Sequence, residues 1–225
     1  MRIVSVARKT LLPGFSALGL AAAATPALAH HPLAGAPMET FAHGLLSGIG
    51  HPILGFDHLF FVALVGIAAV YTGRQFTAPL AYVATMIAGC LLMTAGIAMP
   101  LAEIVIGASL LVLGAAVLSG KALSPSLALV AFGAAGLFHG SAFGTSIAGQ
   151  EGGAALAVLA GYLIGLAAVQ YFISVGAGLF AKTVLGAGEA AAVPARIAGA
   201  VVAGMGLLLT LENAEGIAFA ALGIA

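Results

Sequence analysis

Residues 154–180 read AALAVLAGYLIGLAAVQYFISVGAGLF and contain no charged side chain. A transmembrane helix needs about 20 consecutive apolar residues, so this stretch is long enough to cross a bilayer. Inside the hydrocarbon core every backbone N–H and C=O has to be hydrogen-bonded within the protein. A long apolar run in which polar and apolar residues do not alternate meets this requirement as a helix and not as a strand of a β-barrel. The stretch therefore predicts a membrane-spanning helix.

The rest of the chain has the same character. Of its 225 residues, 62% are hydrophobic and 6% are charged, whereas a soluble domain carries about 25% charged residues. This composition excludes a water-soluble enzyme. The 7 Lys and Arg residues form no basic stripe that could neutralise the phosphates of a nucleic acid. We therefore expect the lipid bilayer as the surroundings of the chain and no nucleic acid as a partner.

Apolar segments of similar length recur along the chain. We expect an all-α integral membrane protein, namely a six-transmembrane-helix bundle that follows a cleavable signal peptide. The fourth segment carries Gly136, Gly140 and Gly144 on one face, and small residues on one face allow helices to approach closely in lipid. The tail 217–225 is too short to cross on its own. The predicted helices cover residues 54–71, 78–99, 101–118, 126–148, 154–180 and 195–211.

The start of the chain has the features of a secretory signal peptide. A basic beginning is followed by an apolar stretch and by the small-residue pattern Ala-Leu-Ala at 27–29. We expect residues 1–29 to be removed and residues 30–225 to form the transmembrane domain. The mature chain would then begin with His30 and His31 outside the cytoplasm, where two imidazoles beside a free amine are a weaker candidate for collecting metal ions.

The charged residues predict the orientation of the helices. Cytoplasmic loops of membrane proteins carry an excess of Lys and Arg. When the mature N-terminus is placed outside the cytoplasm, all basic residues of the mature chain fall on the cytoplasmic side. The acids fall at the outer ends, apart from Asp57 and Glu189. The basic residues are Arg74, Lys121, Lys182 and Arg196, and the outer acids are Glu39, Glu103, Glu151, Glu212 and Glu215.

Polar residues at membrane depth mark candidate functional positions, because each one costs about a few kcal/mol in lipid. His51, Asp57 and His58 lie close together in the sequence, and imidazole with carboxylate suits divalent Ni, Co or Zn. On a regular helix His51 and His58 would lie about 10.5 Å apart along the axis. Pro52 and Gly55 favour a break that would bring the side chains together. Alternatively, these side chains only cap helix starts or bond to a neighbour.

His139 lies at a similar depth on the fourth predicted helix, in the stretch FHGSAFG at 138–144. A lone histidine on an apolar helix is more often a hydrogen-bonded core residue than a ligand, but the matching depth favours a site shared with His58. His43 repeats the His-Gly-x-x-x-Gly pattern of His139 and is a weaker candidate. The single cysteine, Cys90, lies in an apolar run and is expected to pack in the core.

Two of these stretches resemble the signatures of the HupE/UreJ family of hydrogenase- and urease-associated nickel (cobalt) permeases. The first is the pattern H-x5-D-H at 51–58, with an internal Pro and Gly, and the second is the stretch at 138–144. The second signature of the family usually ends in Glu, two residues after its last Gly, where this chain has Ser146. The nearest acid is Glu151, so Ser146 and Glu151 are weaker candidates for the site.

The resemblance implies uptake of Ni²⁺ or Co²⁺ across the bacterial inner (plasma) membrane, with a periplasmic mature N-terminus. It implies hydrogenase or urease maturation proteins as partners and no prosthetic group, since the metal ion is the transported species. The residues that the resemblance marks as handling the metal are His51, Asp57, His58 and His139.

Three functions stay open on the sequence. We expect a permease and not an enzyme. An intramembrane zinc metalloenzyme could use His51, His58 and His139 to activate water, although the chain has no H-E-x-x-H pair. A metal-binding accessory protein that does not transport would bind ions without flux, and Ser146 in place of the family's Glu leaves this third alternative open.

Overall fold

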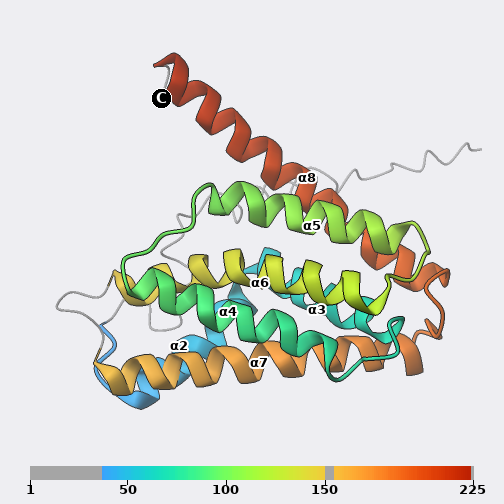
Figure 1. The fold of residues 1–225 in the computed structure, drawn as a ribbon, viewed down its shortest axis with the longest axis horizontal. Helices are drawn as coiled ribbons and strands as arrows, with labels where there is room; N and C mark the ends of the chain where they lie inside the picture. Colours follow the sequence, from blue (N-terminus) through green and yellow to red (C-terminus); the bar gives the residue numbers. More distant parts are fainter. Residues whose placement is uncertain (1–36, 150–154, 224–225) are drawn as a thin grey trace, which may run out of the picture.

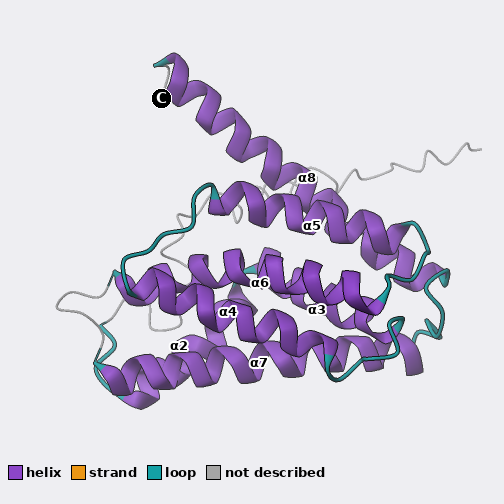
Figure 2. Ribbon diagram, viewed as in Figure 1, coloured by secondary structure: helices purple, strands orange, loops and turns teal. Residues whose placement is uncertain are grey.

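The computed structural model describes residues 37–149 and 155–223, and this part of the chain forms seven helices joined by loops (Figure 2). The all-helical fold predicted from the composition is confirmed. The predicted signal peptide, His30, His31 and Glu151 lie outside the described residues. The helices are α2 (Phe41–Leu54), α3 (Phe56–Val70), α4 (Ala78–Thr94), α5 (Ala102–Leu118), α6 (Pro125–Ala148), α7 (Leu156–Thr183) and α8 (Val193–Leu222).

α2 is a helix that the sequence does not predict. It begins after Thr40, whose hydroxyl accepts a hydrogen bond from the backbone N–H of His43 at 3.2 Å. It ends at Leu54, Gly55 separates it from α3, and the two helices are bent by 82° at this break. Three glycines and Pro52 in a helix of 14 residues give a poor intrinsic helix propensity. Packing on α7 therefore stabilises α2.

α4 is shorter than predicted, because it ends at Thr94 and not at residue 99. Gly96 adopts a left-handed conformation with φ 81°, and the N–H of Ile97 bonds to the carbonyl of Leu92 at 2.9 Å. This pattern closes a helix at its C-terminal end. The glycine, and not the Met-Pro pair further on, therefore terminates α4.

α8 is longer than predicted. The sequence places its end at residue 211, whereas the helix continues to Leu222 and is capped by Gly223 with φ 68°. The predicted end is too early, because the polar residues that follow residue 211 end the apolar run without ending the helix. The second half of α8 extends beyond the other helices (Figure 1).

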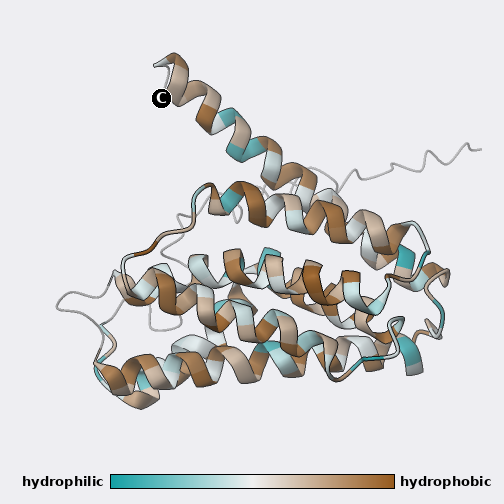
Figure 3. Ribbon diagram, viewed as in Figure 1, coloured by the Kyte–Doolittle hydropathy of each residue, from teal (hydrophilic) through white to brown (hydrophobic). Residues whose placement is uncertain are grey.

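The helices have the length and surface of a membrane bundle. α6, α7 and α8 are long and apolar enough to cross a bilayer, and the bent pair α2–α3 passes the same test together. α4 and α5 have 17 residues each, or about 25 Å of helix, slightly less than the hydrocarbon thickness of about 30 Å. Large apolar side chains face outward, such as Phe172 at 71% exposure, and apolar residues cover the helices (Figure 3). The chain is a multi-pass membrane protein.

Glycines bring the helices together in close pairs. A Cβ at Gly140 of α6 would collide with the carbonyl oxygen of Met86 in α4, and Gly136 and Gly144 face the same helix. The close-packing face predicted on the fourth segment is thus confirmed. Close contacts of the same kind join α5 to α8, where Gly114 meets Ala203 and Gly199. These contacts let helices associate where the hydrophobic effect gives no preference for protein over lipid.

α2 and α3 both pack on α7. A Cβ at Gly44 of α2 would meet the carbonyl oxygen of Val158, near the start of α7, and a Cβ at Gly66 of α3 would meet that of Ser174, further along the same helix. The order of these contacts shows that α2 packs near the start of α7 and α3 packs further along it. The single helix α7 therefore contacts the chain on both sides of the break at Gly55.

Candidate metal site

The break between α2 and α3 positions the first group of predicted site residues. Asp57 and His58 lie in the first turn of α3, directly after Gly55. A Cβ at Gly55 would lie 3.2 Å from Cδ2 of His58 and 3.4 Å from Oδ1 of Asp57. A larger residue at position 55 would therefore crowd the His58 ring, although the φ of −84° is open to any residue.

Two histidines from helices distant in sequence meet at this point. Nδ1 of His58 lies 3.0 Å from Nδ1 of His139 on α6, and both side chains are buried. Nε2 of His58 lies 3.7 Å from Oδ2 of Asp57. The structure thus brings together three of the residues that the sequence singles out, in the order carboxylate, imidazole, imidazole.

His139 is enclosed by side chains from three further helices. Its ring stacks on Phe61 of α3, with centroids 4.4 Å apart and planes at 20°. Tyr82 of α4 meets its edge at a centroid distance of 5.8 Å. On the side of α5, its Nε2 lies 3.0 Å from Oγ of Ser109. Packing and hydrogen bonding therefore fix both the plane and the rotation of this ring.

His51 is held by a different set of groups. Its Nδ1 lies 3.1 Å from the hydroxyl of Tyr162 on α7 and 3.2 Å from Oγ of Ser146 on α6. The Tyr162 hydroxyl also donates a hydrogen bond to the carbonyl of Phe143 at 2.9 Å. The ring of Phe143 contacts both His51 and His58, at centroid distances of 5.1 and 4.4 Å. Ser146, a weaker candidate from the sequence, thus lies against His51.

The remaining predicted candidates are elsewhere or have other roles. The hydrogen bonds of His43 are local, with its Nδ1 accepting from the N–H of Glu39 at 3.2 Å, and His43 lies about 12 Å before His51 along α2. Cys90 is a buried free thiol of α4, as predicted. Within residues 37–149 and 155–223, no three His, Cys, Asp or Glu side chains converge as a metal-binding group. A bound ion would therefore need water or other oxygen atoms besides Asp57 and His58.

Sequence reasoning misses Tyr162, Ser109 and Gln170. Gln170 is fully buried in α7, and neither of its amide atoms has a hydrogen-bond partner in the described part of the chain. Ser174, one turn further along the same face, is also buried and without such a partner. The position of Gln170 in the middle of a charge-free apolar run is the signal that could have found it.

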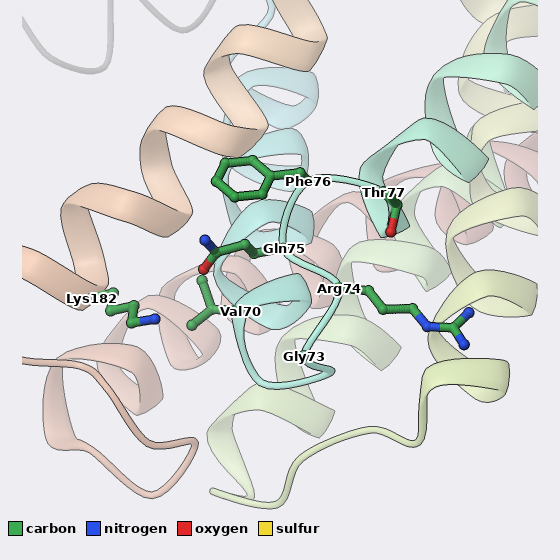
Figure 4. A pocket seen from close by; sticks show the side chains of 7 residues that line it. All are labelled: Val70, Gly73, Arg74, Gln75, Phe76, Thr77 and Lys182. Carbon is green, nitrogen blue, oxygen red and sulfur yellow. The ribbon is translucent and has the colours of Figure 1, made fainter.

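The opposite end of α3 carries the basic residues. A pocket of about 420 Å³ lies there, lined by the connection from Gly73 to Thr77 and by Lys182 of α7. Figure 4 shows Lys182 and Arg74 on different sides of this connection. The two ends of α3 therefore differ in charge, with Asp57 at its start and Arg74 and Lys182 at its end.

A transmembrane bundle with a carboxylate and two histidines at a helix break agrees with the comparisons to known proteins. Residues 18–209 match the family described as HupE / UreJ protein, and the chain belongs to this family. The family is associated with nickel uptake linked to hydrogenase and urease, and its members are generally considered transport proteins rather than enzymes.

One relative in this family is Protein HupE of Rhizobium leguminosarum bv. viciae. It is 33% identical to this chain over 193 residues, which cover 84% of this chain and 94% of the relative. No solved structure matches the chain.

Proposed function

We propose that this chain is a permease that carries Ni²⁺ or Co²⁺ inward across the bacterial inner membrane for the maturation of metalloenzymes. The observation that carries the proposal is the placement of Asp57 and His58 at the break between two helices, with Nε2 of His58 3.7 Å from Oδ2 of Asp57. Family membership supports transport as the class of activity.

The chemistry of the pair suits a divalent ion. Moving such an ion into a bundle is costly unless ligands replace its water and neutralise its charge. Asp57 supplies the negative charge, and His58 supplies an imidazole that Ni²⁺ and Co²⁺ accept. The Asp57 side chain is 31% exposed and that of His58 is 11% exposed. We therefore expect an entering ion to meet the carboxylate first and the imidazole second.

The proposed direction of transport follows the charges. If the basic residues Arg74 and Lys182 face the cytoplasm, the end of α3 with Asp57 and His58 faces outward and receives the ion. The membrane potential would then supply about 4.6 kcal/mol per 100 mV for a divalent cation, since one charge gains about 2.3 kcal/mol.

Uptake of ⁶³Ni²⁺ by cells that express the full chain tests the proposal. Asp57→Asn keeps the size of the side chain and removes its charge, and we expect it to lower the initial rate at least about tenfold. Glu103→Gln is the matched control, because Glu103 is also an acid in the first turn of a helix. Unchanged uptake by Asp57→Asn, at equal amounts of protein in the membrane, overturns the proposal.

Purified protein in liposomes separates transport from binding alone. We expect external Ni²⁺ to enter vesicles that contain the wild-type chain and not those with His58→Gln, whereas His43→Gln should behave as the wild type. Stoichiometric binding of Ni²⁺ without flux would favour the accessory protein, the alternative that Ser146 leaves open.

A further inference from the structure

The hydrogen bonds of His139 constrain where the protons lie. A neutral imidazole has one N–H donor and one acceptor nitrogen. Both nitrogens of His139 are engaged, since Nδ1 lies 3.0 Å from Nδ1 of His58 and Nε2 lies 3.0 Å from Oγ of Ser109. The two facing Nδ1 atoms can share only one proton, so one histidine donates and the other accepts.

Ser109 decides which of the two histidines donates. Its hydroxyl has a single proton, and it donates this proton to the carbonyl of Ile106 at 2.7 Å, a shorter contact than the one to His139. The oxygen of Ser109 is then the acceptor for an N–H at Nε2 of His139. It follows that Nδ1 of His139 is the acceptor nitrogen, and that Nδ1 of His58 carries the proton between the rings.

If Nδ1 of His58 donates the hydrogen bond to His139, the other nitrogen of His58, Nε2, carries a lone pair. Nε2 of His58 faces Oδ2 of Asp57 at 3.7 Å, so two electron-pair donors face each other. Donor atoms about 2.1 Å from one metal ion lie about 3.0 Å apart when adjacent and about 4.2 Å apart when opposite. The observed separation lies between these two values, so a shift of a few tenths of an ångström would bring both atoms to one ion, and a cation between them would relieve their repulsion.

We propose that Ser109 and His139 are positioning residues that hold His58 in the tautomer whose Nε2 binds the ion. The proposal rests on the proposed function, because it takes Asp57 and His58 as the groups that receive the metal. In it His139 acts through His58 and does not itself bind the metal. Hydrogen bonds from a ligating histidine to a second group typically change metal affinity by about 10- to 100-fold.

The tautomer is measured directly by ¹⁵N NMR of the metal-free, full-length protein with labelled histidine in detergent. The signals of His58 are identified by their loss in His58→Gln. We expect Nδ1 of His58 to be protonated and Nε2 to be unprotonated, and we expect His139→Leu to move the proton to Nε2. A protonated Nε2 in the wild type overturns the proposal.

Calorimetry with NiCl₂ tests the effect on binding. We expect Ser109→Ala to weaken Ni²⁺ binding about tenfold and Ser109→Thr, which keeps the hydroxyl, to restore it. Ser119→Ala is the matched control, since Ser119, directly after the end of α5, also donates to a carbonyl of that helix, at 2.6 Å. Equal weakening by Ser109→Thr and Ser109→Ala contradicts the role of the hydroxyl.

Two variants of His139 separate a positioning role from a ligand role. His139→Asn keeps an oxygen that can accept the proton from Nδ1 of His58, whereas His139→Leu does not. We expect His139→Asn to retain binding within about threefold and His139→Leu to lose about 10- to 100-fold. Equal loss in both variants shows that His139 binds the metal itself.

These measurements fail separately from the proposed function. If the wild type binds Ni²⁺ but gives no flux in liposomes, the permease is wrong, and the NMR and calorimetry alone decide the positioning by Ser109 and His139. If flux is observed while Nε2 of His58 is protonated, the positioning is wrong and the permease stands.

Discussion

The hydroxyl of Tyr162 lies 3.1 Å from Nδ1 of His51, and the same hydroxyl donates to the carbonyl of Phe143 at 2.9 Å. One side chain of α7 thus connects the histidine that precedes the helix break with the helix that carries His139. We expect this connection to matter for uptake.

Tyr162→Phe removes the hydroxyl and keeps the ring. We expect a loss of about 1 kcal/mol in the free energy of unfolding, the usual net worth of a hydrogen bond, and a severalfold lower rate of Ni²⁺ uptake. Tyr171→Phe is the control, because it removes a hydroxyl of α7 that bonds to the carbonyl of Phe76 at 3.1 Å. The idea fails if both variants lower uptake equally.

Ser146→Glu places a carboxylate beside His51, since Oγ of Ser146 lies 3.2 Å from Nδ1 of that residue. A further negative charge near the ion should strengthen binding, and we expect Kd for Ni²⁺ to fall about tenfold, or about 1.4 kcal/mol. Calorimetry with NiCl₂ and CoCl₂ measures the change. Ser146→Gln has the same length without the charge, so a similar gain in that variant would contradict the electrostatic cause.

Gly140→Ala tests the packing of α6 on α4, where an added Cβ would collide with the carbonyl oxygen of Met86. Because backbone cannot yield easily, we expect a loss of about 1–3 kcal/mol in the free energy of unfolding in detergent. Gly133→Ala, on the same helix, brings its Cβ no closer than 3.6 Å to Thr85 and should change stability little. Equal stability of the two variants contradicts the predicted clash.

Gln170→Leu tests whether the buried amide lies on the route of the ion. The residue is eight positions after Tyr162 on α7, or about 12 Å further along the helix. A buried polar group without a partner costs about 1–3 kcal/mol, so we expect the variant to be at least as stable as the wild type while its uptake falls. Gln170→Asn should keep part of the uptake. Full uptake by a stable Gln170→Leu protein would show that the amide has no part in transport.

Much of the fold follows from the apolar runs alone. α6 lies within one residue of its predicted bounds, because Ser124 caps it and Pro125 begins it. α2 could not be predicted in this way, since its stability comes from contact with α7 and not from its own residues. The end of α8 could not be predicted either, because hydropathy gives the length of an apolar segment and says little about where a helix stops.

One part of the candidate site can be predicted from the depth of its residues in the membrane. The equal depth of His58 and His139 on their helices predicts that the two meet, and their Nδ1 atoms lie 3.0 Å apart. The partners of His51 lie on α7 and α6, and the sequence does not predict α2, the helix that carries His51, or its place beside them. Ser109 is a single hydroxyl in an apolar helix, and nothing in one sequence distinguishes it from a hydroxyl that bonds only to its own backbone.

The support of the bend by α7 limits how the site can open. Gly44 and Gly66 lie on opposite sides of Gly55, and each presses against the backbone of α7, at Val158 and at Ser174. If the bend at Gly55 straightened, α2 or α3 would lose its contact with α7. We therefore expect the bend at Gly55 to keep its angle during transport. Access to His58 from either face of the bilayer would change through displacement of the neighbouring helices α5 and α6.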